Sequence, residues 1–209
     1  ADARTNLLNL TPAAAEEALR AFAVSVGEAP YRGAQAARHL WMSPAADFTA
    51  MSDLPAGFRA KLAERFTLPR LQLAGEQRST DGTRKFLFTM ADGQSIETVA
   101  IPDGNRLTLC ISSQAGCALQ CAFCATGAMG FVRNLEPFEI AGQVRELAFL
   151  DEPIRPTNIV FMGMGEPLMN WKAVDTVLTI LNDPRGIGIG RSEEHTSELQ
   201  SRGLISYAV

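Results

Sequence analysis

The sequence predicts an α/β protein in which a small helical domain and a β-hairpin precede the first units of a parallel sheet. Three observations predict this class. Apolar residues recur at helical spacing over the first seventy residues. Asp92-Gly93 then marks a two-residue turn between two alternating segments, and from Leu107 onward buried strand patterns alternate with helical patterns. We expect a helical domain at 1–70, a linker and hairpin at 71–106, a sheet domain at 107–190 and a separate tail at 191–209.

The helical domain is expected to contain three helices. The first begins at Thr11-Pro12, where a capping residue precedes proline at the first helical position, and ends at Gly27. A second helix is expected over 32–41, stopped by Ser43-Pro44, and a third over 56–66. Together they predict a small bundle that could act as an accessory domain.

The hairpin carries a carboxylate of interest. Its strands are expected over 84–90 and 95–101, on either side of Asp92-Gly93. Along the return strand Glu97, Val99 and Ile101 share one face, so a carboxylate lies in line with two β-branched residues. Glu97 is therefore a candidate functional residue, and the alternative is an ordinary exposed strand residue.

The alternating region predicts a site at one edge of a parallel sheet. Strands are expected over 107–112 and 158–162, a helix over 137–150, and a further helix capped by Asn170. Loops that follow neighbouring parallel strands meet at the same edge of the sheet. One of these loops carries cysteines and the other reads Gly-Met-Gly-Glu-Pro, so we expect both to build one site.

The four cysteines of the chain fall within fifteen residues, and three of them form C-x3-C-x2-C. Three closely spaced thiolates can hold three irons of a [4Fe-4S] cluster and leave the fourth iron open for chemistry. An all-cysteine zinc site or a set of buried thiols are the alternatives. Zinc is disfavoured because Cys110 falls inside a predicted strand and is separated from Cys117 by six residues. The four are Cys110, Cys117, Cys121 and Cys124.

Net charge and hydropathy exclude few classes of protein function. The net charge of −4 does not indicate a nucleic-acid partner, but residues 59–85 hold seven basic residues against three acidic ones. That segment is either a solvated surface or a patch that contacts phosphates. Residues 107–132 are uncharged, but polar residues interrupt them, so no membrane span is expected. No secretory leader is visible, which favours cysteines as ligands over a disulfide framework. His39 and His195 are given no role.

The last nineteen residues, 191–209, show neither helical nor strand periodicity where a third strand is due. The string resembles the translation of a sequencing-library adapter. We therefore expect a non-native tail, and the alternative is a polar surface tail.

The C-x3-C-x-Phe-Cys pattern, placed after the first strand of an α/β unit, resembles the radical S-adenosylmethionine (SAM) superfamily. The resemblance implies that Cys117, Cys121 and Cys124 ligate a [4Fe-4S] cluster whose open iron chelates SAM. It also implies that one electron from the cluster cleaves SAM to a 5'-deoxyadenosyl radical. Gly165 and Glu166 match the glycine-rich segment that binds the SAM amino group.

Further stretches resemble the RlmN/Cfr family of RNA adenine methyltransferases, and within it the branch that methylates C2 of adenine in 23S rRNA and tRNA. The resemblance implies a partial (β/α) barrel behind a helical RNA-binding domain, in a monomeric cytoplasmic bacterial enzyme that receives electrons from a flavodoxin-type protein. The stretches are 31–35 (YRGAQ), 78–83 (RSTDGT), 97–102 (ETVAIP), 110–117 (CISSQAGC) and 163–168 (GMGEPL).

The resemblance also implies residue roles. A cysteine near the C-terminus of such enzymes is methylated first, Cys110 matches the cysteine that resolves the protein–RNA adduct, and Glu97 matches the proton acceptor. All four cysteines here are already assigned, so the methyl-accepting cysteine is absent and we expect this chain to be inactive in methyl transfer. Two alternatives stay open: a C8-specific methyltransferase of the same family, and a zinc-bound four-cysteine module that binds RNA.

Overall fold

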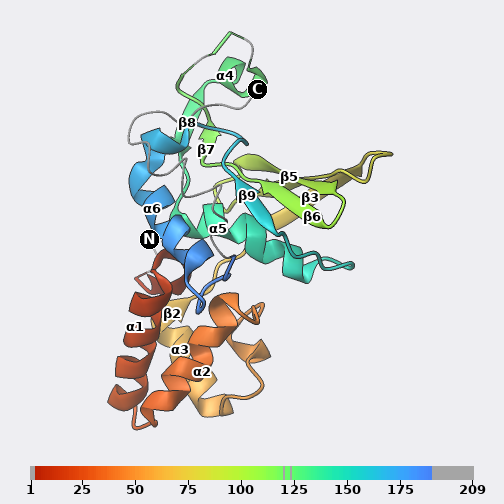
Figure 1. Cartoon of the computed structure of the whole chain (residues 1–209). Helices are drawn as coiled ribbons and strands as arrows, with labels where there is room; N and C mark the ends of the chain where they lie inside the picture. The colour runs from red at the N-terminus through yellow and green to blue at the C-terminus, as the bar shows by residue number, and fades with distance from the viewer. Residues whose placement is uncertain (1–2, 120, 123, 190–209) are drawn as a thin grey trace.

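The computed structural model describes residues 3–119, 121–122 and 124–189 of the chain. Three helices form the first part, at the bottom of Figure 1: α1 (Pro12–Ser25), α2 (Pro30–Trp41) and α3 (Ala56–Arg65). Thr11 caps α1 as predicted, because its hydroxyl accepts a hydrogen bond from the backbone N–H of Ala14. The helix α2 begins two residues earlier than predicted, at a proline that suits the first helical position.

A five-stranded mixed sheet forms the second part. Its order is β3-β4-β5-β6-β9, and only β6 and β9 run parallel. The predicted hairpin is present as β4 and β5, and the predicted parallel pair as β6 and β9. The edge strand β3 lies in the stretch that was expected to be a linker. The bounds are β3 (Gln72–Arg78), β4 (Arg84–Thr89), β5 (Ser95–Asp103), β6 (Arg106–Cys110) and β9 (Asn158–Val160).

A short two-stranded ribbon closes the cysteine loop. Strand β7 (Gln114–Gly116) pairs antiparallel with β8 (Phe131–Asn134), and the one-turn helix α4 (Ala125–Ala128) lies between them. Figure 1 shows the ribbon leading up to α4, at the end of the molecule opposite the helical part. The sequence did not predict this ribbon.

Helix α5 (Pro137–Glu146) lies between the helical part and the sheet (Figure 1). It covers the sheet face that carries the buried residues Ile96, Thr98 and Ala100 of β5. The opposite face is half-exposed, and Glu97 shares it with Val99, as predicted. After α5 come η3 (Leu147–Phe149), η4 (Pro167–Asn170) and α6 (Trp171–Asn182), and α6 packs against α5.

The remaining short elements complete the helical part. They are β1 (Thr5–Asn6), which pairs with β2 (Phe66–Thr67), η1 (Leu7–Asn9) and η2 (Phe48–Ala50). One hydrophobic core runs from the helical bundle through α5 to the sheet. The division into domains at residues 70, 106 and 190 stays a prediction.

Candidate functional site

The cysteine loop is closed at its base by a glycine. Gly116 has φ +75°, and a β-carbon at this position would collide with the backbone carbonyl of Gly130. The next residue, Cys117, donates its N–H to that same carbonyl over 3.0 Å. The chain can therefore approach itself this closely only with glycine at position 116, and the contact closes one loop that carries Cys117, Cys121 and Cys124.

The three thiols have the chemistry that an iron–sulfur cluster needs. All four cysteines are free, Cys117 is buried and the other three are half-buried. Cys124 occupies the N-cap of α4, and its N–H donates to the carbonyl of Cys121 over 3.0 Å. Within the described residues, no three side chains of His, Cys, Asp or Glu are already gathered as a metal-binding group. The donor set fits the cluster, since thiolates are its usual ligands.

The Gly-Met-Gly-Glu-Pro loop packs directly against the segment that leads into the cysteine loop. The carbonyl of Met164 accepts from the N–H groups of Ser113 and Gln114, over 2.8 and 3.1 Å. The Ser112 hydroxyl accepts from the N–H of Met164 over 2.9 Å and donates to the carbonyl of Glu97 over 2.6 Å. These bonds fix both loops at one edge of the sheet, as the parallel-strand pattern predicted.

Glycine is required in this loop for contact with the chain itself. A β-carbon on Gly163 would meet the carbonyl of Ile111 at 2.7 Å. Gly165 has φ +98°, and a β-carbon there would collide with the side chain of Gln114. The space beside these two glycines is therefore filled by the strand-end segment 111–114.

Glu166 is buried at the end of this loop. Its backbone N–H donates to the side-chain oxygen of Gln114 over 2.9 Å, and its carboxylate accepts from the N–H of Leu168 over 3.0 Å. The Gln114 amide in turn donates to Asn134 of β8 over 2.8 Å. Gln114 thus ties the glutamate loop to the ribbon that closes the cysteine loop.

Cys110 and Glu97 lie on the same face of the sheet. Cys110 pairs with Val99 across β5 and β6, and Val99 is two residues from Glu97. Burial raises the pKa of the Cys110 thiol, although the backbone N–H of Met162 opposes this by donating to the sulfur. The Glu97 carboxylate is 46% exposed and pairs with the Lys85 ammonium over 3.0 Å. The structure therefore brings both predicted residues to the half-exposed face.

Two buried amides support the site. Gln143 was not expected to have a role, whereas Asn170 was expected to cap a helix; it holds the N-cap position of α6, but its side chain makes no capping bond there. Gln143 of α5 accepts from the N–H of Ser112 and donates to its carbonyl, each over 2.8 Å, and also accepts from the hydroxyl of Thr98. Asn170 donates to the carbonyls of Ser113 and Leu135, over 2.9 and 2.8 Å. The available signal was a polar residue on the apolar stripe of the predicted helix 137–150.

Most of the basic segment 59–85 is paired internally. Arg78 and Arg84 both contact the Glu76 carboxylate, over 2.6 and 2.8 Å, which together hold its pKa below the usual value. Arg70 pairs with Glu146, and Lys85 pairs with Glu97. These pairs favour the solvated-surface interpretation over a phosphate-binding patch.

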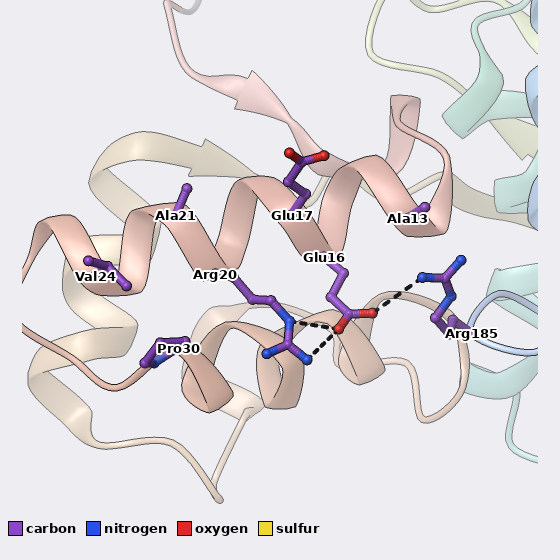
Figure 2. A pocket seen from close by; sticks show the side chains of 8 residues that line it. All are labelled: Ala13, Glu16, Glu17, Arg20, Ala21, Val24, Pro30 and Arg185. Atoms are coloured by element: carbon purple, nitrogen blue, oxygen red, sulfur yellow. Dashed lines mark hydrogen bonds and ion pairs between the residues drawn. The ribbon is translucent and has the colours of Figure 1, made fainter.

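A hollow of about 430 Å³ on α1 offers little chemistry. Figure 2 shows Glu16 at its centre, contacted by Arg20 over 2.7 Å and by Arg185 over 3.7 Å. The rest of the lining includes small apolar side chains such as Ala21 and Pro30. The ion pair between Arg185 and Glu16 links residue 185 to α1. Because this central carboxylate is already paired, the hollow is not a candidate active site.

None of the described helices is both long and apolar enough to cross a membrane. The predicted tail 191–209 lies outside the described residues, as does His195.

Two family models match the chain. The ribosomal RNA large subunit methyltransferase N-terminal domain matches residues 5–68, and the radical SAM superfamily matches residues 111–205. The second match covers the whole cysteine loop and runs beyond residue 190.

Curated relatives and a solved structure agree with these matches. The "Probable dual-specificity RNA methyltransferase RlmN" of Gemmatimonas aurantiaca is 62% identical over 185 residues, which are 88% of this chain and 51% of that protein. The dual-specificity RNA methyltransferase RlmN of Magnetococcus marinus is 47% identical, over 89% of this chain and 53% of that protein.

A crystal structure of a radical SAM methyltransferase from Sphaerobacter thermophilus superimposes with a TM-score of 0.76 at 39% identity, over 89% of this chain and 54% of that chain. The chain thus spans about half the length of the curated relatives it matches. Since the helical part and the cysteine-loop part match separate models and both occur together in these relatives, the chain belongs to the RlmN/Cfr family of radical SAM proteins.

Proposed function

We propose that this chain is part of a radical SAM methyltransferase that methylates C2 of adenine in 23S rRNA and tRNA. The observation that carries the proposal is the junction of the two loops. Bonds from Met164 and Glu166 to Ser113 and Gln114 hold the glutamate loop at the base of the closed cysteine loop. The names of the relatives, both dual-specificity RNA methyltransferases, give the substrate class.

In this proposal Cys117, Cys121 and Cys124 hold a [4Fe-4S] cluster, and Gly165 and Glu166 bind SAM. When bound, the cluster and SAM supply the one-electron chemistry that C2 of adenine requires, because this electron-poor carbon offers no electron pair to a polar methyl donor. A carboxylate suits the SAM ammonium group. Burial of Glu166 would keep water away from that contact and strengthen it.

Cys110 and Glu97 act on the RNA in this proposal. Glu97 accepts a proton from the modified base. Cys110, as thiolate, attacks the sulfur that bridges protein and base, so that a disulfide forms, the carbon–sulfur bond breaks, and its electron pair goes to the carbon, which takes up a proton as the new methyl group. Both lie on the face that α5 leaves uncovered, which a flipped-out base can reach. Because burial raises the pKa of the Cys110 thiol, less of it is thiolate, and a base must remove its proton before it attacks.

The helical part, residues 1–70, is proposed to bind the RNA, and a flavodoxin-type protein is proposed to supply electrons. We further propose that the enzyme works as a monomer in the cytoplasm, where its RNA substrates are. A base in a loop is favoured over one in a duplex because unstacking it costs less.

Cluster chemistry is tested on this chain by anaerobic reconstitution with iron and sulfide. We expect a brown protein with an iron–sulfur absorption band that cleaves SAM reductively to 5'-deoxyadenosine. The variant Cys121→Ala should lose both signals, whereas Cys110→Ala should keep them. A colourless protein with one bound zinc would instead establish the four-cysteine zinc module.

Methyl transfer is tested with a chimaera in which residues 5–189 replace the matching part of the Gemmatimonas relative. RNA incubated with the chimaera, SAM and a reductant is digested and analysed by mass spectrometry. We expect 2-methyladenosine, while 8-methyladenosine would show the C8 alternative. The 209-residue chain alone is expected to give neither product, and methylated RNA from it would contradict that expectation.

A further inference from the structure

Strand β8, which returns the chain from the cysteine loop, gains little from apolar burial. Phe131 and Val132 leave 47% and 54% of their surfaces exposed, whereas Arg133 is half-buried. The backbone of Arg133 pairs with Ala115 of β7, directly before the residue that closes the base of the loop, Gly116. The polar contacts of β8 therefore set how firmly this strand, and the loop that it closes, is held.

The Arg133 guanidinium binds carboxylates from two other elements. Its Nη1 and Nη2 donate to the two carboxylate oxygens of Glu139, over 2.7 and 2.8 Å, and its Nε donates to the carboxylate of Asp92 over 2.6 Å. Glu139 lies in the first turn of α5, and Asp92 lies in the turn between β4 and β5. One side chain thus joins β8 to a helix and to a hairpin turn.

The Glu139 partner is buried and fixed in place. Its side chain is 5% exposed, and its carboxylate also accepts from the backbone N–H of Glu136 over 2.8 Å, at the start of α5. Hydrogen bonds to Glu139 and Asp92 raise the pKa of Arg133, and the bond from Arg133 holds the pKa of Asp92 below its usual value. A two-pronged bond to a fixed, buried carboxylate restricts the strand more than an exposed ion pair would.

Helix α5 thereby holds both ends of the cysteine loop. Gln143 binds the backbone of Ser112, which precedes the loop, and Glu139 binds Arg133, which follows it. Gln143 and Glu139 are four residues apart, so they share one face of the helix. We propose that Arg133 is a positioning residue that keeps the cysteine loop closed and ready to receive an iron–sulfur cluster. The identity of the cluster rests on the function proposed above, whereas the closure of the loop does not.

The first test uses the chain without metal. Cys117 is buried beside the closed base of the loop, and a reagent reaches such a thiol only when the loop opens. In Arg133→Gln, iodoacetamide should modify Cys117 about ten-fold faster than in the unsubstituted chain, because charge-assisted bonds that oppose opening are lost. Peptide mass spectrometry gives the rate at each cysteine. The rate at Cys110, which lies in β6, should stay the same. A rise at both cysteines would indicate that the whole chain unfolds and would count against a local role.

Arg84→Gln is the matched control. Arg84 also binds a carboxylate, that of Glu76, through Nε over 2.8 Å and Nη2 over 3.2 Å, and it lies in β4, which pairs with neither β7 nor β8. Cys117 should react in this variant as it does in the unsubstituted chain. Arg133→Lys keeps the charge but not the planar fork of nitrogens, so its rate should lie between those of the unsubstituted chain and of Arg133→Gln.

The second test follows anaerobic reconstitution with iron and sulfide. Arg133→Gln should lose most of its iron on desalting, whereas Arg84→Gln should keep the iron content of the unsubstituted chain. Urea unfolding of both variants without metal identifies conditions in which each is fully folded. The loss of iron from Arg133→Gln should persist under those conditions, because it comes from the opened loop and not from unfolded protein.

Equal rates at Cys117 in Arg133→Gln and Arg84→Gln would overturn the proposal. Faster modification with an unchanged iron content would support the closure of the loop and overturn its importance for the cluster. If the unsubstituted chain takes up no cluster, the proposed function fails, while the thiol rates still decide whether Arg133 holds the loop.

A second variant decides the matter if Arg133→Gln does not fold. Asp92→Asn removes the charge of the partner that is 41% exposed and leaves the pair with Glu139 in place. It should raise the rate at Cys117 in the same direction by a smaller factor, and no rise would overturn the proposed anchor at the hairpin turn.

Discussion

Gln143 is a fully buried side chain that acts like a piece of β-strand. Its amide oxygen and nitrogen pair with the N–H and the carbonyl of Ser112, as a neighbouring strand would. Ser112 in turn bonds Met164, so one glutamine on α5 supports both loops of the candidate site. An exposed glutamine could not do this, because water would compete for the same backbone groups.

Replacing Gln143 with leucine is expected to destabilise the protein by about 3 kcal/mol, because buried backbone groups of Ser112 and the Thr98 hydroxyl would lose their partner. The free energy of unfolding from urea denaturation measures this. Gln77→Leu, at an exposed position on β3, is the matched control and should change it by less than about 0.5 kcal/mol. Equal effects of the two substitutions would show that the Gln143 bonds contribute little.

The pH dependence of Cys110 follows from its burial. The pKa of the Cys110 thiol is raised above the ordinary value, so a smaller fraction of it is thiolate at a given pH. The reactive thiolate therefore increases only as the pH rises through that higher value. In a variant with Cys117, Cys121 and Cys124 replaced by alanine, iodoacetamide should modify Cys110 more slowly than it modifies a free peptide thiol. The rate should still be rising at a pH where the peptide rate has levelled. A plateau shared with the peptide would contradict the burial effect.

Single residues differ in how far the sequence could predict them. The cysteines and the Gly-Met-Gly-Glu-Pro loop were predictable because spacing and strand alternation carry that information. The pairing of Glu97 with Lys85 was not, since cross-strand neighbours depend on the register of a hairpin. Gln143 was visible only as a polar residue out of place on an apolar stripe.

At the scale of elements, the ribbon β7–β8 is the part of the fold that periodicity could not predict. Strands of three and four residues are too short for an alternation pattern, and residues 117–130 separate the two. Strand β3 was missed for another reason. It is exposed along most of its length, so its residues do not alternate between apolar and polar.

The ribbon is expected to matter for metal loading, and two glycines, Gly116 at the end of β7 and Gly130 just before β8, allow a matched test. Gly116 and Gly130 both have positive φ, but only at Gly116 would a β-carbon collide with backbone. Gly130→Ala should cost about 1 kcal/mol for its backbone conformation alone. Gly116→Ala should cost more and open the base of the loop, so that the reconstituted protein contains less iron per chain. Equal iron contents in the two variants would show that the close contact between Gly116 and Gly130 is not needed for cluster assembly.

At the scale of the whole molecule, the helical part and the sheet are joined by specific bonds as well as by a shared core. Asn9 of η1 accepts from the N–H of Phe138 over 3.0 Å and donates to the carboxylate of Glu136 over 2.8 Å, at the start of α5. Arg145 holds the end of α2 from the other end of α5. Helix α5 is thus fastened to the helical part at both of its ends, and a rigid connection follows.

This connection predicts that the two parts unfold together, and the two tryptophans can report on each part separately. Trp41 lies in α2 and Trp171 begins α6, so Trp171→Phe leaves a reporter in the helical part and Trp41→Phe leaves one in the helix that packs against α5. For each variant, the midpoint of the urea transition followed by fluorescence should equal the midpoint followed by circular dichroism. Asn9→Ala should lower both midpoints together, because it removes bonds that span the two parts. A midpoint that moves for Trp41 alone would show that the helical part unfolds independently of the sheet.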